Sequence, residues 1–306
     1  QELKARIASV IVGQAQTVDL VLTAILANGH VLIEGVPGVA KTLLARLTAR
    51  LIDADFSRVQ FTPDLMPSDV LGTTVFNMKT NAFDFHQGPI FADIVLVDEI
   101  NRAPAKTQAA LFEVMEERQI SIDGTTHRMG DLYTILATQN PVEQEGTYKL
   151  PEAQLDRFLM KITMDYPSLE EEVNILERHH TNAALVKLDD ITPAITKEEL
   201  LSLRAFMNQV FVDRTLLQYI ALIVQQTRTS KAVYLGASPR ASVAMLQSSK
   251  AYALLQGRDF VTPEDIKFVA PYVLQHRLIL TAEAEMEGYS PVKVTQRLID
   301  KVEVPK

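Results

Sequence analysis

The chain has 306 residues, of which 47% are hydrophobic and 22% are charged, a balance typical of globular proteins. It contains no cysteine, which excludes disulfides and cysteine-based zinc sites and fits a reducing compartment, so we expect a cytoplasmic protein. The formal net charge of −8 argues against a broad nucleic-acid-binding surface, and no run of about 18 apolar residues predicts a membrane span.

Four apolar runs predict buried strands, and helical patterns lie between them. The runs occupy residues 31–33, 94–97, 133–137 and 159–164. Ahead of the first run, residues 14–28 carry apolar side chains at helical spacing. Strands that alternate with helices predict an α/β fold, in which a parallel sheet has helices on both faces.

Two segments interrupt this alternation and predict β-hairpins. The first, at residues 72–88, has alternating apolar side chains around a polar turn at 79–81. The second, at residues 119–131, has Asp123-Gly124 between two strand-like runs, which is a strong hairpin signal. We expect both hairpins to be insertions between elements of the core.

From residue 167 onward the patterns are helical. Thr262, followed by Pro263 and two acidic residues, is a well-formed helix start. Together with the chain length, this change of character predicts two domains, an α/β core at 1–166 and an all-helical domain at 167–306.

Residues 35–42, GVPGVAKT, lie between a predicted strand and a predicted helix, which is the context of a phosphate-binding loop. In such a loop the backbone N–H groups face a phosphate, Lys41 reaches the β- and γ-phosphates, and the Thr42 hydroxyl binds Mg²⁺. The pattern asks for glycine where this chain has Ala40. We expect Ala40 to adopt helical dihedrals, which alanine favours. A tight turn with a surface lysine is the alternative.

Unusual dihedrals or a close approach to phosphate are expected instead at Gly35 and Gly38.

Two adjacent carboxylates, Asp98 and Glu99, end the second predicted strand. Ligands of open α/β sheets sit at the carboxyl ends of strands, so Asp98 is a candidate Mg²⁺ ligand. Glu99 is a candidate general base for water. A helix start with acids stabilised by the helix dipole is the alternative.

Three further polar residues are candidates for a phosphoryl-transfer site. Asn140 follows the third strand and could position water or a γ-phosphate, although an ordinary Asn-Pro turn has the same pattern. Arg157 precedes the fourth strand, and Arg240 opens a helix of the second domain; a guanidinium suits the charge of a phosphoryl transition state. The alternatives are an ion pair of Arg157 with Asp156 or Glu152, and a solvated helix residue for Arg240.

Taken in order, these features resemble the MoxR family of AAA+ ATPases, of the helix-2-insert type. The resemblance covers the chain essentially from end to end, and it is carried by GVPGVAKT (35–42), IVLVDEINRAP (94–104), LATQNP (136–141), LPEAQLDRF (150–158) and GASPRA (236–241). Alanine before the loop lysine is common in this family's pattern. The resemblance implies that residues 72–88 are the helix-2 insert and residues 119–131 the pre-sensor-1 hairpin.

The resemblance also implies the roles of single residues in a site for ATP or ADP and Mg²⁺ between core and lid. Asn140 matches sensor 1, Arg240 matches sensor 2, and Arg157 matches an arginine finger that serves the neighbouring subunit. Arg102 is a further candidate for action between subunits. Thr42 and Asp98 would hold the metal, and Glu99, Lys41, Asn140, Arg157 and Arg240 would be catalytic. The implied nucleotide contacts are Val12, Gly13, Gly35, Val36, Pro37, Gly38, Val39, Ala40, Lys41, Thr42, Leu43, Asp98 and Arg240.

By the same resemblance, the chain would form a hexameric ring that hydrolyses ATP and remodels or matures client proteins in a chaperone-like way. A protein with a von Willebrand factor A domain is an implied partner. Three other functions stay open: a nucleotide-gated binding module, a DNA-stimulated motor, and a chelatase-type subunit. The second hairpin has only a few cationic side chains and also carries two aspartates, so it lacks the basic stripe expected of a DNA-stimulated motor.

Two groups of side chains are interpreted as structural. Adjacent His179 and His180 point to different sides of a helix, so we expect a solvated helix end rather than a metal site. Three phenylalanines of the first hairpin and its flank are interpreted as packing residues rather than client contacts, namely Phe83, Phe85 and Phe91.

Overall fold

The computed structural model describes residues 2–36, 38–141, 146–181 and 188–304. Its centre is a five-stranded sheet with the order β2-β5-β8-β1-β9, in which every neighbouring pair is parallel. The strands are β1 (Val31–Gly35), β2 (Phe56–Gln60), β5 (Ile94–Asp98), β8 (Thr134–Gln139) and β9 (Met160–Met164). The four strands predicted from apolar runs are confirmed, and the sheet is parallel as expected.

The sequence did not predict β2, and its position explains why. It is an edge strand, paired only with β5, and within it only Val59 is buried. An edge strand that is largely exposed has no continuous apolar run, so its sequence, FSRVQ, lacks the signal of a buried parallel strand.

Helices cover both faces of the sheet, as predicted. Along β1, Val31 and Ile33 belong to one core cluster and Leu32 to the other, which is the alternation that a strand imposes. The first cluster includes side chains of α2 (Ala15–Leu26) and α3 (Lys41–Leu51). The second cluster contains the apolar face of α5 (Ala105–Glu117). The remaining helical elements before residue 167 are α1 (Glu2–Val10), α4 (Pro67–Leu71), η1 (Pro89–Phe91), η2 (Ile100–Arg102) and α6 (Glu152–Leu155).

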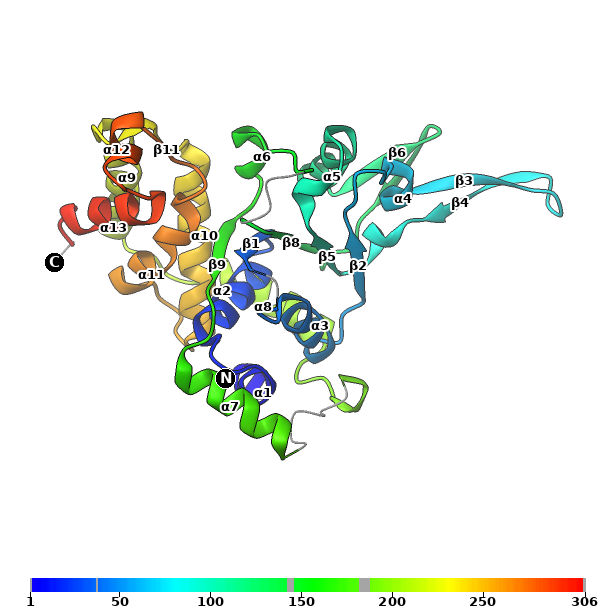
Figure 1. Ribbon diagram of the computed structural model, residues 1–306, viewed down its shortest axis with the longest axis horizontal. Helices are drawn as coiled ribbons and strands as arrows, with labels where there is room; N and C mark the ends of the chain where they lie inside the picture. The colour runs from blue at the N-terminus through cyan, green and yellow to red at the C-terminus, as the bar shows by residue number, and fades with distance from the viewer. Residues whose placement is uncertain (1, 37, 142–145, 182–187, 305–306) are drawn as a thin grey trace.

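Both predicted hairpins are present. The first pairs β3 (Gly72–Asn77) with β4 (Ala82–Gln87), and it projects away from the body of the molecule (Figure 1). The second pairs β6 (Gln119–Ile122) with β7 (Thr125–Arg128). Its turn has positive φ at both Asp123 and Gly124, 49° and 79°, which is the geometry that an Asp-Gly turn favours.

The three phenylalanines divide between two environments. Phe85 packs against Phe91 and against His127 of the second hairpin, with ring centroids 5.9 and 4.2 Å apart. These contacts join the bases of the two hairpins and confirm packing for Phe85 and Phe91. Phe83 lies farther along the hairpin, where it is 72% exposed but packs against Phe76 with ring centroids 5.1 Å apart, so packing within the hairpin is confirmed for Phe83 as well.

The described part of the C-terminal region is helical, with one short pair of strands inside it. The helices are α7 (Leu169–His180), η3 (Leu188–Asp190), α8 (Lys197–Met207), α9 (Arg214–Thr229), α10 (Pro239–Leu255), α11 (Pro263–Leu274), α12 (Ala282–Met286) and α13 (Pro291–Lys301). The strand pair joins β10 (Val233–Leu235) to β11 (Ile279–Leu280) in antiparallel orientation. Strands of three and two residues are too short to leave a pattern in the sequence.

Helices α7 and α8 contact the first domain, and α9 to α13 form a group at one side of the molecule, from which α10 packs against α2 and α11 against β9 (Figure 1). Arg178 of α7 donates to the Ser9 carbonyl over 2.7 Å, and Arg204 of α8 donates to the Ile25 carbonyl over 2.9 Å. The domain boundary at residues 166–167 stays a prediction. Within the described part of the chain, no helix is long and apolar enough to cross a membrane.

Candidate functional site

Three predicted segments meet where the strands end. Gly35 ends β1, Asp98 ends β5, and Asn140 directly follows β8. Because these strands are parallel and adjacent in the sheet, their carboxyl ends lie along one edge, which we call the carboxyl edge. The structure therefore brings the loop, the two carboxylates and Asn140 to the same place. Asn140 is buried there, with 6% of its surface exposed.

Ala40 has the opposite backbone conformation from the one expected. Its φ and ψ are 59° and 24°, in the left-handed region, so the prediction of helical dihedrals is wrong. The residue at this position turns the chain into α3, and glycine adopts that conformation without a steric cost from Cβ. This explains why the general loop pattern asks for glycine here.

Gly38 has the unusual dihedral expected of this loop, whereas the close approach at Gly35 is to a neighbouring strand and its approach to phosphate stays a prediction. Gly38 has a φ of 89°, which is the unusual dihedral predicted for this loop. A Cβ at Gly35 would lie 2.8 Å from the Met164 carbonyl oxygen, so the close approach is to β9. Val36 is half-buried against the core, and the predicted contact Pro37 lies outside the described residues.

Lys41 opens α3 and bends back over the loop. Its Nζ donates to the Gly35 carbonyl over 2.6 Å. The pKa of Lys41 lies below its ordinary value because burial outweighs the opposing effect of Asp98 and Glu99. Both carboxylates are therefore close enough to act on the ammonium group. Thr42 follows it and is half-buried at the start of the helix.

The two carboxylates are held by side chains that the sequence did not single out. Thr138 Oγ1 donates to Asp98 Oδ1 over 3.0 Å and accepts the Glu99 N–H over 3.0 Å. Arg58 Nε donates to Asp98 Oδ2 over 2.6 Å. The Glu99 carboxylate accepts a hydrogen bond from Gln60 over 2.8 Å. Arg58 and Gln60 both lie on β2, so missing that strand meant missing them.

Arg102 pairs with Glu99 of the same chain, with 3.0 Å between Nε and Oε2. Glu99 itself has a φ of 56°, a left-handed conformation that costs energy in a residue with a Cβ. The strained backbone and the contacts to Gln60 and Arg102 fix the Glu99 carboxylate in one orientation. Action of Arg102 between subunits stays a prediction.

The carboxyl edge suits Mg²⁺ bound together with phosphates. Among the described residues, no three acidic or histidine side chains cluster to hold a metal ion by themselves. Mg²⁺ usually takes only one or two protein ligands when phosphate oxygens and water complete its coordination. The Thr42 hydroxyl and the Asp98 carboxylate are hard oxygen ligands of this kind, so the residues present fit the ion.

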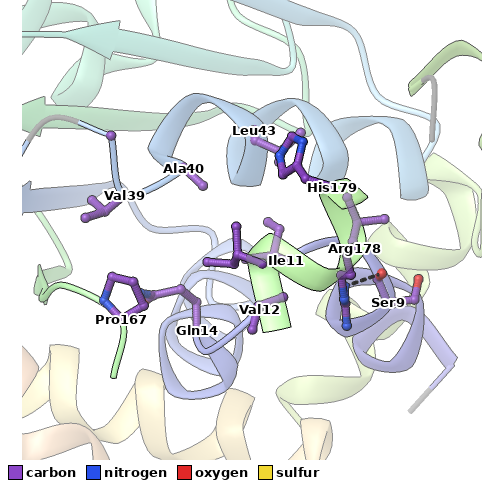
Figure 2. Close-up of a pocket in the computed structure, with 13 residues that line it drawn as sticks. Ser9, Ile11, Val12, Gln14, Val39, Ala40, Leu43, Pro167, Arg178 and His179 are labelled. Atoms are coloured by element: carbon purple, nitrogen blue, oxygen red, sulfur yellow. Dashed lines mark hydrogen bonds between the residues drawn. The ribbon is translucent and has the colours of Figure 1, made fainter. Parts of the chain in front are cut away.

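A cavity of about 290 Å³ adjoins the loop (Figure 2). It lies between the α1–α2 junction, the loop and the first residues of α3, Pro167, and α7. Its apolar wall suits a flat aromatic ring such as a nucleotide base. The residues that line it are Ser9, Val10, Ile11, Val12, Gln14, Gly38, Val39, Ala40, Leu43, Pro167, Ile175, Arg178 and His179.

The predicted contacts Val12, Val39 and Leu43 are among these residues, whereas Gly13 is not. Gly13 has a φ of 77°, and a Cβ there would lie 2.5 Å from the Glu171 carboxyl carbon, so the chain needs glycine at this junction. His179 lines the cavity, which the interpretation as a merely solvated helix end did not anticipate. Nothing in the sequence of α7 indicates which of its faces meets the loop.

The structure places Arg157 and Arg240 at the opposite edge of the sheet. Arg157 precedes β9, whose first residue pairs with Val31 at the start of β1, whereas the loop follows the end of β1. Four residue steps of a strand separate the two ends of β1 by about 13 Å. We call this side the amino edge. Neither arginine therefore reaches the phosphate loop of its own chain.

At the amino edge the two arginines share acidic partners. Arg240 donates to both oxygens of Glu116 over 2.9 Å, and its Nε lies 3.8 Å from Asp156 Oδ2. Arg157 donates to the Phe112 carbonyl over 2.5 Å and lies 3.9 Å from Glu116. The side chain of Arg240 is 57% exposed and that of Arg157 is 30% exposed. Both cations line an open cavity of about 520 Å³ and are accessible to another molecule.

Comparison with known proteins gives consistent matches over both regions. Residues 30–160 match the family described as ATPase family associated with various cellular activities (AAA), and residues 225–300 match the AAA lid domain. The chain is 48% identical over 296 residues to the uncharacterized protein YeaC of Bacillus subtilis, covering 97% of this chain and 92% of that protein. It is 44% identical over 306 residues to the chaperone MoxR1 of Mycobacterium tuberculosis, covering 97% and 80%.

A solved structure is similar over the whole chain. The crystal structure of "a putative ATPase" from Cytophaga hutchinsonii superposes with a TM-score of 0.91 at 41% sequence identity. The match covers 100% of this chain and 94% of that one.

Proposed function

The chain belongs to the MoxR family of AAA+ ATPases, and from this premise we propose that it hydrolyses Mg²⁺-bound ATP between the subunits of a hexameric ring to remodel client proteins. One observation supports the shared site best. The loop and carboxylates lie at the carboxyl edge, whereas Arg157 and Arg240 lie at the amino edge. Each chain thus offers two half-sites that face different directions, and a ring brings unlike halves together.

At the carboxyl edge the reaction begins with phosphate binding. The loop N–H groups and Lys41 Nζ bind phosphate oxygens, for which the lysine leaves the Gly35 carbonyl. Thr42 and Asp98 hold Mg²⁺, which when bound supplies charge neutralisation on the phosphates. The hydrogen bond from Thr138 fixes the orientation of the Asp98 carboxylate. The base of ATP occupies the cavity beside Val12.

Glu99 accepts the proton of the attacking water, and Asn140 orients that water or the γ-phosphate. In the structure the Glu99 carboxylate is bound by Gln60 and Arg102. Both contacts are to Oε2, and an ionised carboxylate has acceptor sites on two oxygens, so Oε1 can accept a hydrogen bond from the attacking water. The second candidate is a nucleotide-gated binding module in which hydrolysis is incidental.

The arginines at the amino edge complete the site of the neighbouring subunit. A guanidinium supplied in trans stabilises the charge of the phosphoryl transition state. The resemblance matches Arg240 to sensor 2, in a nucleotide site between core and lid. Its position next to Arg157 instead supports the neighbour's nucleotide as the target of both side chains.

Two measurements test this proposal. Glu99→Gln should keep ATP binding and lose turnover by a factor of about 10²–10⁴, the range for removal of a general base. Unchanged turnover would take the role of general base away from Glu99. Separately, inactive Lys41→Ala and Arg157→Ala proteins should regain part of the activity when mixed, because one of the two kinds of mixed interface pairs an intact loop with an intact arginine. No recovery in rings of confirmed assembly would contradict the trans site.

The β3–β4 hairpin is the proposed client contact. Near its tip Phe76 and Phe83 are 45% and 72% exposed, with ring centroids 5.1 Å apart, and Met78 is 89% exposed. Its base is joined to the second hairpin through Phe85 and His127. Exposed aromatic side chains on a projecting element suit binding of unfolded or apolar segments.

A client-binding assay can separate remodelling from gating. Reduced, unfolded α-lactalbumin is a suitable apolar probe, and Phe83→Ser in the Glu99→Gln background should weaken its ATP-dependent capture. Lys79→Ser, at the exposed turn of the same hairpin, is the matched control. Client release that proceeds equally with a non-hydrolysable ATP analogue would favour the gated module. A von Willebrand factor A-domain protein stays a proposed partner.

A further inference from the structure

Three consecutive residues after α11 bind the backbone of the segment that carries Arg157. Gln275 Nε2 donates to the Lys161 carbonyl over 2.5 Å, and His276 Nε2 lies 3.0 Å from the Phe158 carbonyl oxygen. Arg277 Nη2 also donates to the Phe158 carbonyl, over 2.7 Å. We call residues 275–277 the lid clamp, because they belong to the region that matches the AAA lid domain.

Arg277 makes most of the contacts of the lid clamp. Its Nε donates to Asp156 Oδ1 over 2.6 Å, and its terminal nitrogens donate to the carbonyls of Asp156 and Leu159, each over 3.2 Å. A further hydrogen bond goes to the Val273 carbonyl of its own domain. These acceptors flank Arg157 on both sides, so the guanidinium encloses the backbone turn that carries it.

The side chains of the lid clamp are buried, so they bind the 156–159 segment in one position only. The Arg277 side chain is 4% exposed, and Gln275 and His276 are each 7% exposed. Burial and the neighbouring Arg277 lower the pKa of His276 well below its ordinary value, so the neutral ring donates its Nε2 proton to Phe158. A buried guanidinium is tolerated only when its donors are satisfied. A displaced 156–159 segment would leave them unpaired.

The lid clamp also reaches the second arginine. Asp156 binds Arg277 through one oxygen, and its other oxygen lies 3.8 Å from Arg240 Nε. Arg240 stands at the start of α10, which packs against α11 and so belongs to the same body as the lid clamp. The segment that carries Arg157 is therefore linked to Arg240 through Asp156 and the buried Arg277, which together join lid and core.

We propose that Arg277 is a positioning residue that holds the Arg157 segment to the lid, so that the lid of one subunit sets where its arginines meet the neighbour's ATP. The inference rests on the proposed trans site. Any movement of the lid caused by a subunit's own nucleotide is then transmitted to the site of the next subunit. A displacement of a catalytic group by about 1 Å costs about 10²-fold in rate, so small lid movements suffice.

The test uses Arg277→Lys, which keeps the charge but loses the fork that binds several acceptors. Alone, this variant should lose about 10- to 100-fold in ATP turnover while its affinity for a fluorescent ATP analogue stays unchanged. Mixed with Lys41→Ala it should recover, since the Lys41→Ala subunit supplies a well-placed Arg157 to the intact loop of the variant. Mixed with Arg157→Ala it should not recover.

Two controls make the result decisive. Arg258→Lys alters a lid arginine that binds Asp265 of the same domain, over 2.7 and 2.5 Å, and it should leave turnover nearly unchanged. Asp156→Asn weakens the lid clamp from the core side and should reproduce the mixing pattern if Arg277→Lys fails to fold. Assembly of each mixture is checked by light scattering.

Failure can be assigned to one proposal or the other. If Lys41→Ala with Arg157→Ala recovers but Lys41→Ala with Arg277→Lys does not, the lid clamp acts on its own subunit's site and the inference is overturned. Weaker binding of the ATP analogue by Arg277→Lys would also overturn it. If neither mixture recovers, the trans site itself is wrong, and the lid clamp has no neighbouring site to act upon.

Discussion

The two edges of the sheet are built in opposite ways. At the carboxyl edge Gly38, Ala40 and Glu99 have left-handed backbone conformations, which strain Ala40 and Glu99, and Lys41 binds a carbonyl of its own loop. At the amino edge, backbone carbonyls of the segment that carries Arg157 accept hydrogen bonds from buried side chains, chiefly those of Arg277 and His276. In the proposed function, the first edge keeps groups ready for a ligand, whereas the second fixes a segment that presents arginines to the neighbouring subunit.

His30 completes the contrast. Its ring is fully buried between β8 and the end of α5, where Nδ1 accepts the Ile135 N–H over 3.0 Å and Nε2 donates to the Met115 carbonyl over 3.2 Å. Its own carbonyl accepts the Leu159 N–H over 2.8 Å. His30 therefore binds two segments of the amino edge: the end of α5, which carries Glu116, and the segment before β9, which carries Asp156 and Arg157.

Removing Arg157 from the amino edge should have the largest effect. Arg157→Ala is expected to lower turnover by about 10³–10⁵-fold, the range for an arginine supplied in trans, because the transition-state charge loses its partner. ATP binding should persist, since the loop lies at the other edge. Phosphate release and binding of a fluorescent ATP analogue measure the two quantities. Equal loss of binding and turnover would mean that the two edges are not functionally separate.

Thr138→Val tests how far the carboxyl edge depends on one hydroxyl. The change keeps the shape but removes the group that binds Asp98 and the Glu99 N–H, and it leaves a buried donor unpaired at a cost of about 1–3 kcal/mol. We expect turnover to fall about 10-fold, which corresponds to 1.4 kcal/mol. Thr134→Val, at a buried hydroxyl of the same strand that has no hydrogen-bond partner, is the control and should keep its activity. Equal turnover in both variants would remove Thr138 from the site.

Much of the carboxyl edge was predictable because its chemistry follows strands with continuous apolar runs. GVPGVAKT, Asp98-Glu99 and Asn140 each come directly after such a run, so parallel pairing alone predicts that they meet. Arg58 and Gln60 were missed because they lie on an edge strand whose sequence is mostly polar. The Ala40 conformation was missed because propensity describes a helix interior, and the residue before α3 is not in one.

The amino edge was much less predictable. Arg157 and Arg240 are 83 positions apart in the sequence, and only the packing of α10 and α11 against the core brings them together. The lid clamp has no local signature either, since Gln275, His276 and Arg277 follow an ordinary helix. Their role depends on which carbonyls they meet, and that is a property of the tertiary structure alone.

Two buried histidines at the amino edge, His30 and His276, have pKa values below the ordinary one and predict a dependence of stability on pH. Burial and Arg118 lower the pKa of His30 from 6.5 to about 3. Between these values the unfolded chain binds a proton that the folded chain does not, so the free energy of unfolding falls as the pH falls below 6.5. The slope for one such group is up to about 1.4 kcal/mol per pH unit.

His30→Gln should therefore make the loss of stability between pH 7 and pH 5 shallower, although the variant is less stable at pH 7. Urea unfolding at several pH values measures this slope. His86→Gln, at an exposed position on β4, is the control and should keep the wild-type slope. A His30→Gln slope as steep as that of the wild type would show that other groups dominate acid unfolding.

Two alanine-to-glycine changes, five residues apart, give the smallest and most local test of the strained edge. Ala40→Gly should stabilise the protein by about 0.5–1 kcal/mol, because a left-handed conformation costs an L-residue about 1–2 kcal/mol and the added freedom of glycine in the unfolded chain offsets part of the gain. Ala45→Gly, inside α3, should destabilise it by about 1 kcal/mol. Urea midpoints at constant m-value measure both. If the two changes alter the free energy of unfolding in the same direction, Ala40 is not strained in solution. The backbone of the carboxyl edge would then follow from sequence preference and not from a conformation held ready for phosphate.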